Sequence, residues 1–280
     1  MSLTAKNLTL DLLLAAGSEP LPVRHLLAAA ALFGIPANNL RVALARLSSD
    51  GMIESVGRGT YQLTASANEL AADVATWRSA CERVRPWQGG HVTVNCGALG
   101  RSDRAALRHR ERALNMLGLK ELDRGLFVRP DNLQGGIDEV RRRLYTLGLE
   151  RDASVFVATD FDSERNARLH ALWDGTALND AYGRLESQLA EWTARAHQLT
   201  IEDAARESYL LGRKAIRQVV FDPLLPAPLV DVDARQRFVH AVLAFDQLGR
   251  GIWQQFHAWV DEPALGAPTT ATSAPSLTAH

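Results

Sequence analysis

The sequence predicts an α+β protein, because three different patterns follow one another along its 280 residues. The first part combines short helical repeats with a glycine-rich hairpin, and the second alternates between strand-like and helical segments. The last part shows almost only the helical repeat. We therefore expect two mixed domains followed by a helical one. The expected boundaries are 1–66 for the first domain, 67–90 for a linker helix and junction, 91–161 for the second domain, 162–261 for the helical domain and 262–280 for a disordered tail.

The first domain contains three helical patterns and a hairpin. Pro36 suits the first turn of the third helix, and Asp50-Gly51 ends that helix. Two alternating segments then flank Gly57-Arg58-Gly59, which predicts a hairpin. The order helix, helix, turn, helix, hairpin is that of a winged helix-turn-helix domain. Its helices are expected over 7–16, 22–33 and 37–49, and its strands over 52–56 and 60–64.

The third helix has an apolar face and a polar, arginine-bearing face, which suits the major groove of DNA. An Asn can bond adenine through two hydrogen bonds, and an Arg can bond guanine or phosphate. The hairpin lies beside such a helix and meets the DNA backbone. We therefore expect contacts to double-stranded DNA from Asn38, Asn39, Arg41, Val42, Arg46, Arg58 and Thr60.

The second domain is expected to be ferredoxin-like, because strands and helices alternate in the order β-α-β-(β)-α-β. A linker helix over 68–84 and a break at Pro86-Trp87-Gln88-Gly89-Gly90 precede it. Its strands are expected over 91–96, 121–129 and 154–159, and its helices over 103–117 and 133–147.

The third domain is expected to consist of long helices. Three prolines exclude regular helix between residues 221 and 230. The residues after 262 are rich in Pro, Ala, Thr and Ser, which predicts a disordered tail. The helices are expected over 170–194, 201–220 and 233–260.

Charge is distributed unevenly, although the net charge is only −1. Residues 78–151 carry 15 basic and 9 acidic side chains, whereas residues 152–280 carry 11 basic and 17 acidic ones. The first 66 residues have a net charge of +1, so DNA binding there depends on a few side chains and on two copies acting together. The asymmetry suggests that different segments meet different partners.

Several classes of protein are excluded by what the sequence lacks. No apolar run is long enough to cross a bilayer, and the N-terminus does not have the layout of a signal peptide. Cys81 and Cys96 do not indicate a disulfide framework. Phosphate-loop, zinc-binding and dinucleotide-binding motifs are absent. We expect a cytoplasmic protein with no catalytic residues, no metal and no cofactor.

Three separated stretches resemble the phenylacetate-catabolism repressor family, the PaaX-type regulators. The first is GIPANNLRVALARLSSDGMIE with GRGTYQLT, and the second is PWQGG, in which Gln88 stands where the family has an acid. The third is Leu172-Trp173-Asp174 followed by FDPLLP, in which Phe221 stands where the family has a basic residue. The order of these motifs matches the family over roughly residues 20–260.

The resemblance implies a homodimeric bacterial repressor with a winged-helix reader, a ferredoxin-like middle domain and a helical C-terminal domain. It also implies a catabolic operon with a palindromic or pseudo-palindromic operator, and release from DNA by a small molecule, an aromatic acyl-CoA thioester. Arginine suits bidentate phosphate contacts, so the basic residues are candidates for holding the phosphates of such an effector. These candidates are Arg129, Arg141, Arg142 and Arg143, with Arg213, Lys214 and Arg217 as an alternative set.

Two other classes of function compete with this interpretation. A ferredoxin-like domain also resembles the metal-dependent nucleases of CRISPR adaptation, which need an acidic residue at the end of the first strand. Here that strand ends in Asn95-Cys96-Gly97, and the next carboxylate is Asp103, so the metal lacks its ligand. The other class is a protein-interaction scaffold with a degenerate winged helix, which would have no affinity for DNA at low salt.

Overall fold

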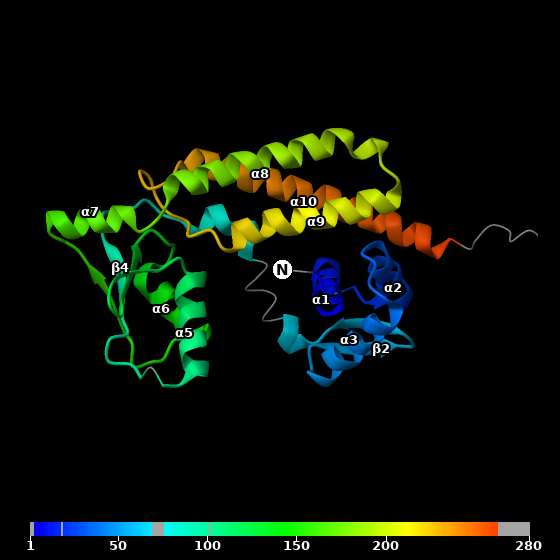
Figure 1. Ribbon diagram of the computed structural model, residues 1–280, viewed down its shortest axis with the longest axis horizontal. Coiled ribbons are helices and arrows are strands. Elements are labelled where there is room, and N and C mark those ends of the chain that lie inside the picture. Colours follow the sequence, from blue (N-terminus) through cyan, green and yellow to red (C-terminus); the bar gives the residue numbers. More distant parts are fainter. Residues whose placement is uncertain (1–2, 18, 69–75, 101, 263–280) are drawn as a thin grey trace, which may run out of the picture.

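The computed structural model describes residues 3–17, 19–68, 76–100 and 102–262. It combines helices with two small antiparallel sheets, which is consistent with the predicted α+β class. Figure 1 shows a layer of long helices along one side, with two smaller units below its opposite ends. We call these parts the N-terminal unit (residues 3–68), the middle unit (76–161) and the helical layer (162–262).

The N-terminal unit packs three helices against a small sheet with the strand order β1-β3-β2. Its core is formed by leucines that the helical spacing places on inner faces, among them Leu8, Leu26 and Leu40, which are at most 1% exposed. The sequence did not predict β1, whose two residues pair with Tyr61 and Thr60. The elements are α1 (Ala5–Ala16), β1 (Leu21–Pro22), α2 (Val23–Leu32), α3 (Ala37–Ser49), β2 (Ile53–Gly57) and β3 (Thr60–Leu63).

The middle unit has a four-stranded antiparallel sheet in the order β5-β6-β4-β7. The single strand predicted over 121–129 is wrong, because the chain turns back at Arg124-Gly125 and forms a hairpin. Gly125 has φ of 75°, and a Cβ there would lie 2.9 Å from the Cα of Gly97, so the turn requires glycine. The elements are β4 (His91–Asn95), α5 (Arg104–Met116), β5 (Lys120–Asp123), β6 (Leu126–Pro130), α6 (Gly136–Thr146) and β7 (Ser154–Ala158).

The helical layer contains one more helix than predicted. The helix expected over 170–194 is wrong at its start, because the chain breaks at Trp173-Asp174. Asp174 caps the next helix by accepting from the N–H of Ala177 at 2.8 Å, while the indole N–H of Trp173 bonds to the carbonyl of Gly118 at 3.1 Å. The non-helical stretch 221–230 is confirmed. The elements are α7 (Ser163–Ala171), α8 (Gly175–Arg195), a 3-10 turn (Ala196–Gln198), α9 (Ile201–Val220) and α10 (Val232–Asp261).

Two predicted segments fall partly outside the described residues. The linker helix expected over 68–84 is described only at its ends, and its C-terminal end is a 3-10 helix over Thr76–Arg83 that packs against α9 and α10. The predicted tail, 262–280, lies outside the described residues from 263 onward. Among the helices within the described ranges, none is long and apolar enough to span a membrane.

Arg129 joins the middle unit to the helical layer. Its side chain is 2% exposed, and its guanidinium donates to the carbonyls of Leu117, Pro130 (3.1 Å) and Pro223 (3.2 Å) and to the amide oxygen of Asn132 (3.1 Å). Burial lowers the pKa of Arg129 to about 10, so the side chain stays charged at neutral pH. Its assignment as a phosphate ligand is therefore corrected, because its donors are used inside the protein.

The same joint fixes the proline-rich segment between α9 and α10. The amide of Asn132 donates to the carbonyl of Leu224 at 2.7 Å. Gly118 has φ of 70°, and a Cβ there would lie 2.7 Å from the Cβ of Pro223. Side chains and backbone of the middle unit therefore replace the helical hydrogen bonds that the prolines remove.

We expect Arg129→Met to destabilise the protein by about 3 kcal/mol, because it leaves buried carbonyls without donors. Urea unfolding followed by circular dichroism measures this loss. Arg124→Met, at an exposed position on the hairpin turn, is the matched control and should change stability by less than about 0.5 kcal/mol. Equal stability of the two variants would contradict the bridging role of Arg129.

Candidate nucleic-acid interface

Helix α3 forms because its sequence separates an inner and an outer face. Leu40, Ala43, Leu44 and Leu47 are all buried, and at 100° per residue they occupy one side of the helix. Pro36 precedes the helix, and the N–H of Asp50 closes it on the carbonyl of Arg46 at 2.8 Å. The sequence predicted the bounds of this helix correctly.

The opposite face of α3 is polar and open to solvent. Asn38, Asn39, Arg41 and Arg46 are exposed, and Val42 is 43% exposed. Within the described part of the chain, neither Arg41 nor Arg46 is held by an ion pair. Their guanidinium groups are therefore available to an outside partner.

The β2–β3 hairpin stands next to α3. Arg58 lies at its tip and is exposed, and it forms no ion pair with a described residue. The hairpin is anchored because the carbonyl of Gly59 accepts from the N–H of Val23 at 2.7 Å. Thr60 is half-buried at the start of β3, where it pairs with Pro22. Arg58 is thus presented to solvent, whereas Thr60 is partly enclosed by β1.

One contact between the N-terminal unit and the helical layer centres on Asp11 of α1. The hydroxyl of Tyr209 on α9 donates to Asp11 at 2.7 Å, and Arg213 pairs with the same carboxylate at 3.1 Å. Burial is the largest effect on Asp11 and raises its pKa, while Tyr209 and Arg213 act in the opposite direction. Arg213, an expected effector residue, therefore serves to dock the N-terminal unit.

A second contact joins α2 to the end of α10. The Nε2 atom of His25 lies 2.8 Å from Asp261, and Arg24 pairs with the same carboxylate at 2.5 Å. The ring of His25 stacks on that of His257, with 4.4 Å between centroids. Burial, with a contribution from His25, lowers the pKa of His257 to about 4. No sequence signal identified this contact, because its partners are more than 230 positions apart.

The other expected effector residues do not form one site. Arg141 pairs with Asp138 at 2.7 Å and Arg142 pairs with Glu139 at 2.6 Å, both within α6. Arg143 also lies on α6. Arg217 lies over the ring of Phe221 at 4.8 Å, and Lys214 donates to Gln188 at 3.0 Å. The structure therefore separates these residues between two helices.

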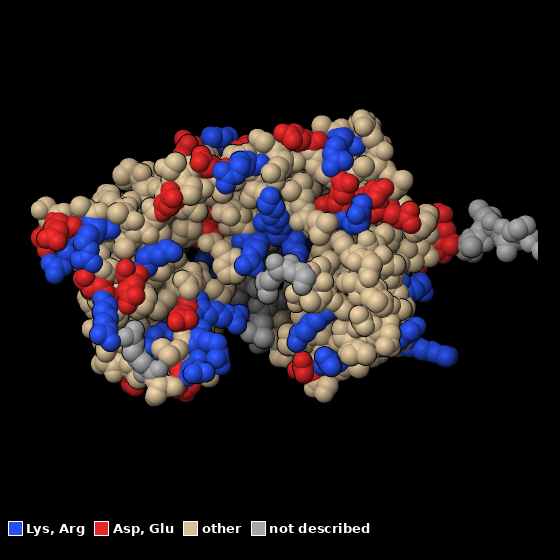
Figure 2. Space-filling view, viewed as in Figure 1, with Lys and Arg blue, Asp and Glu red and all other residues tan. Residues whose placement is uncertain are grey.

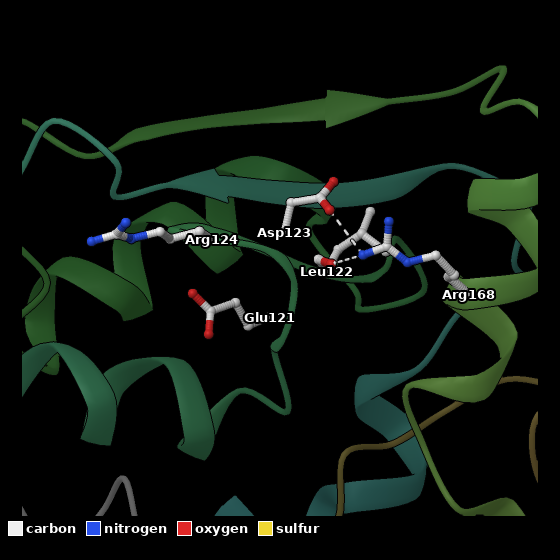
Figure 3. A pocket seen from close by; sticks show the side chains of 5 residues that line it. All are labelled: Glu121, Leu122, Asp123, Arg124 and Arg168. Carbon is white, nitrogen blue, oxygen red and sulfur yellow. Dashed lines mark hydrogen bonds and ion pairs between the residues drawn. The ribbon is translucent and has the colours of Figure 1, made fainter.

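The described part of the chain has one shallow pocket beside the middle unit and another in the helical layer. Figure 3 shows a polar one of about 480 Å³ between the β5–β6 hairpin and α7, where Arg168 bonds to Asp123 at 2.8 Å and Arg124 points away from Arg168. The second pocket, the α8–α9 groove, has about 440 Å³. Lys214 lines the α8–α9 groove, together with Gln188, Glu191, Trp192, Arg195, Glu207, Leu210 and Leu211.

Residues 173–255 match the family model for the PaaX-like protein C-terminal domain. This segment of the chain therefore resembles the C-terminal domain of PaaX-like proteins. This family is one of transcriptional regulators, and the matched segment covers α8, α9 and most of α10. A similar solved structure is that of the uncharacterized protein Rv0674 from Mycobacterium tuberculosis, with 26% identity over 90% of this chain and 100% of that chain and a TM-score of 0.57. No curated protein matches this chain.

We expect the contact at His257 to weaken as the pH falls. The pKa of His257 is about 4 in the folded protein, against 6.5 for an unperturbed histidine in the unfolded chain. Between these two values the unfolded chain binds a proton that the folded protein does not. The resulting stability is fully present above pH 6.5 and is lost towards pH 4, with a loss of about 2 kcal/mol by pH 5 before partial screening by solvent at this half-buried ring. Thermal unfolding of the protein and of His257→Phe between pH 7 and 5 measures it. A constant difference between the two melting temperatures would contradict the expectation.

Proposed function

We propose that this PaaX-like protein is a sequence-specific DNA-binding repressor, with the N-terminal unit as a winged helix-turn-helix reader. The observation that carries the proposal is the outer face of α3, which presents two Asn and two Arg to solvent beside the hairpin tip at Arg58. A helix of this size fits the major groove, and a hairpin beside it reaches the backbone.

The exposed side chains divide into two roles. Asn38 and Asn39 lie in the first turn of α3, the end that enters the groove, and can bond adenine. Arg41 and Arg46 bond guanine or phosphate, and Arg58 meets phosphate or the minor groove. Val42 lies between the two arginines on the open face and contacts thymine methyl groups.

The middle unit fits a ferredoxin-like domain, since its element order is β-α-β-β-α-β and its sheet is antiparallel. A nuclease activity is disfavoured by the surroundings of β4. Asp103 caps α5 by accepting from the N–H groups of Ala105 (2.7 Å) and Ala106 (3.2 Å), so it is engaged in a structural role. Burial raises the pKa of the Cys96 thiol, which disfavours a nucleophilic thiolate.

The functional unit is a homodimer that binds a palindromic or pseudo-palindromic operator. One N-terminal unit offers few phosphate contacts, and two related by a twofold axis double them. The dimer represses a catabolic operon, as the resemblance to the phenylacetate-catabolism repressors implies.

The effector is an anionic small molecule of the aromatic acyl-CoA class, and the α8–α9 groove is its site. This groove combines the ammonium of Lys214 with apolar surface from Leu211 and Leu210, which is 49% exposed. An acyl-CoA has both a charged and an apolar part, and the volume lies within the range of small-molecule sites. The groove also borders α9, whose Tyr209 and Arg213 hold the N-terminal unit, so a ligand there can change how the reader is docked.

We expect Arg41→Ala to abolish sequence-specific binding, because it removes a base or phosphate contact inside the groove. Arg58→Ala should weaken binding to all sequences alike. Gel shifts with an operator selected from random duplexes, and with a scrambled duplex, measure both effects. Arg124→Ala, remote from α3, is the control. Unchanged affinity in both test variants would refute the assigned roles.

We expect Lys214→Gln to weaken binding of phenylacetyl-CoA about tenfold, because a charged hydrogen bond contributes about 1.5 kcal/mol. Isothermal calorimetry on the full chain measures the dissociation constant. The Arg141→Gln/Arg142→Gln variant alters arginines that are paired within α6 and should bind as the wild type does. The α8–α9 groove is not the site if only the α6 variant loses affinity.

A further inference from the structure

A row of three arginines lies along the outside of α5. Arg104, Arg108 and Arg112 are four residues apart, so at 100° per residue they fall within an arc of about 80° along about 12 Å of helix. All three are exposed, and none forms an ion pair with a residue that the structure describes. We call this row the α5 arginine stripe.

Four arginines elsewhere in the described chain have the local carboxylate partner that the stripe lacks. Arg141, Arg142, Arg165 and Arg206 each pair with a carboxylate three residues before them on the same segment. Two carboxylates lie near the stripe: Glu111 at its edge and Asp103, which caps α5 and interacts electrostatically with Arg108. Neither forms an ion pair with a described arginine. The stripe therefore retains an excess of positive charge.

The stripe stands on a fixed support. The opposite face of α5 is buried through Ala113 (0% exposed) and Leu114 (2%). Arg110, on that inner side, pairs with Glu150 at 2.5 Å and bonds to the carbonyl of Gly100 at 3.0 Å. Because the helix cannot rotate without breaking these contacts, its charged row keeps one direction.

The stripe helix faces the reader. Figure 1 shows α5 on the side of the middle unit that is turned towards the N-terminal unit. Figure 2 shows that the molecule is hollowed between the two units, and that Lys and Arg side chains gather around this hollow. Positively charged walls around a concave surface attract a polyanion.

We propose that the α5 arginine stripe is a second DNA-binding surface, which contacts phosphates of the duplex that α3 reads. Three arginines along 12 Å match three to four nucleotides of one strand, which rises about 3.4 Å per nucleotide. The contacts are to phosphate, so they add affinity and register but no sequence preference. This inference rests on the proposed function, because it presupposes that α3 brings DNA to the protein.

The test is the salt dependence of binding to a fluorescein-labelled 40-base-pair duplex of mixed sequence, measured by anisotropy between 50 and 250 mM KCl. Each phosphate contact contributes about 0.9 to the slope of log Kd against log salt. The Arg104→Gln/Arg108→Gln/Arg112→Gln variant should therefore lower the slope by about 3 per protomer and weaken binding at 50 mM KCl at least tenfold. The single variant Arg108→Gln should lower the slope by about 1.

Three further variants test whether the change in salt dependence comes from positive charge at the α5 arginine stripe. Arg184→Gln/Arg206→Gln/Arg237→Gln removes the same charge from exposed positions of the helical layer and should leave the slope unchanged. Replacing the three stripe arginines by lysine should preserve binding, because phosphate accepts a point charge. Glu111→Gln removes the carboxylate at the edge of the stripe and should tighten binding.

The outcomes separate this inference from the function on which it rests. If the wild type does not bind the duplex at 50 mM KCl, the proposed function fails and the stripe proposal fails with it. If the wild type binds and Arg41→Ala weakens it, but the stripe variant matches the wild type or its charge-matched control, only the stripe proposal is overturned. A stripe variant that changes the oligomeric state in light scattering, with an unchanged salt slope, also overturns it.

Discussion

The architecture depends on one buried cation. Arg129 enters the space between the sheet of the middle unit and the segment after α9, and its donors satisfy carbonyls on both sides. The proline-rich segment cannot satisfy its own backbone, so it requires a donor from elsewhere. Asn132 donates to the carbonyl of Leu224 in the same segment, and the indole of Trp173 donates back to the carbonyl of Gly118 in the middle unit. The middle unit and the helical layer are thereby joined through hydrogen bonds whose loss would expose buried polar groups, which makes sliding between them costly.

The N-terminal unit is attached in a different manner. Its apolar core is a separate cluster, on which Tyr209 and Trp253 of the layer pack. Its polar links to the layer include two carboxylates, Asp11 and Asp261, each held by an arginine and by one other side chain. Such links are partly solvated and cost less to break than the joint at Arg129. The molecule thus combines a firm joint on one side with a more easily released one on the side of the proposed reader.

The sequence was most informative where local chemistry decides the structure. The bounds of α3 follow from its leucine spacing and from Pro36 and Asp50, so they could be predicted. The hairpin turn at Gly125 and the break at Trp173 could not, because each depends on a distant contact with Gly97 or Gly118. Arg129 looked like a phosphate ligand because burial is invisible in an isolated sequence. The open face of α3 was anticipated residue by residue, and the basic excess of residues 78–151 is visible in the sequence, but only the structure shows that Arg110 is buried and that Arg104, Arg108 and Arg112 form no ion pair with a described residue.

Helix α10 has a mechanical consequence. Its 30 residues form a rod of about 45 Å. Near its start Arg235 donates to the carbonyl of Leu225 in the proline-rich segment, and Asp261 in its last turn holds Arg24 and His25. A tilt of about 4° at one end displaces the other by about 3 Å, close to the rise of one base pair. A small tilt at the middle unit would therefore move the proposed DNA reader by about one base pair along a duplex.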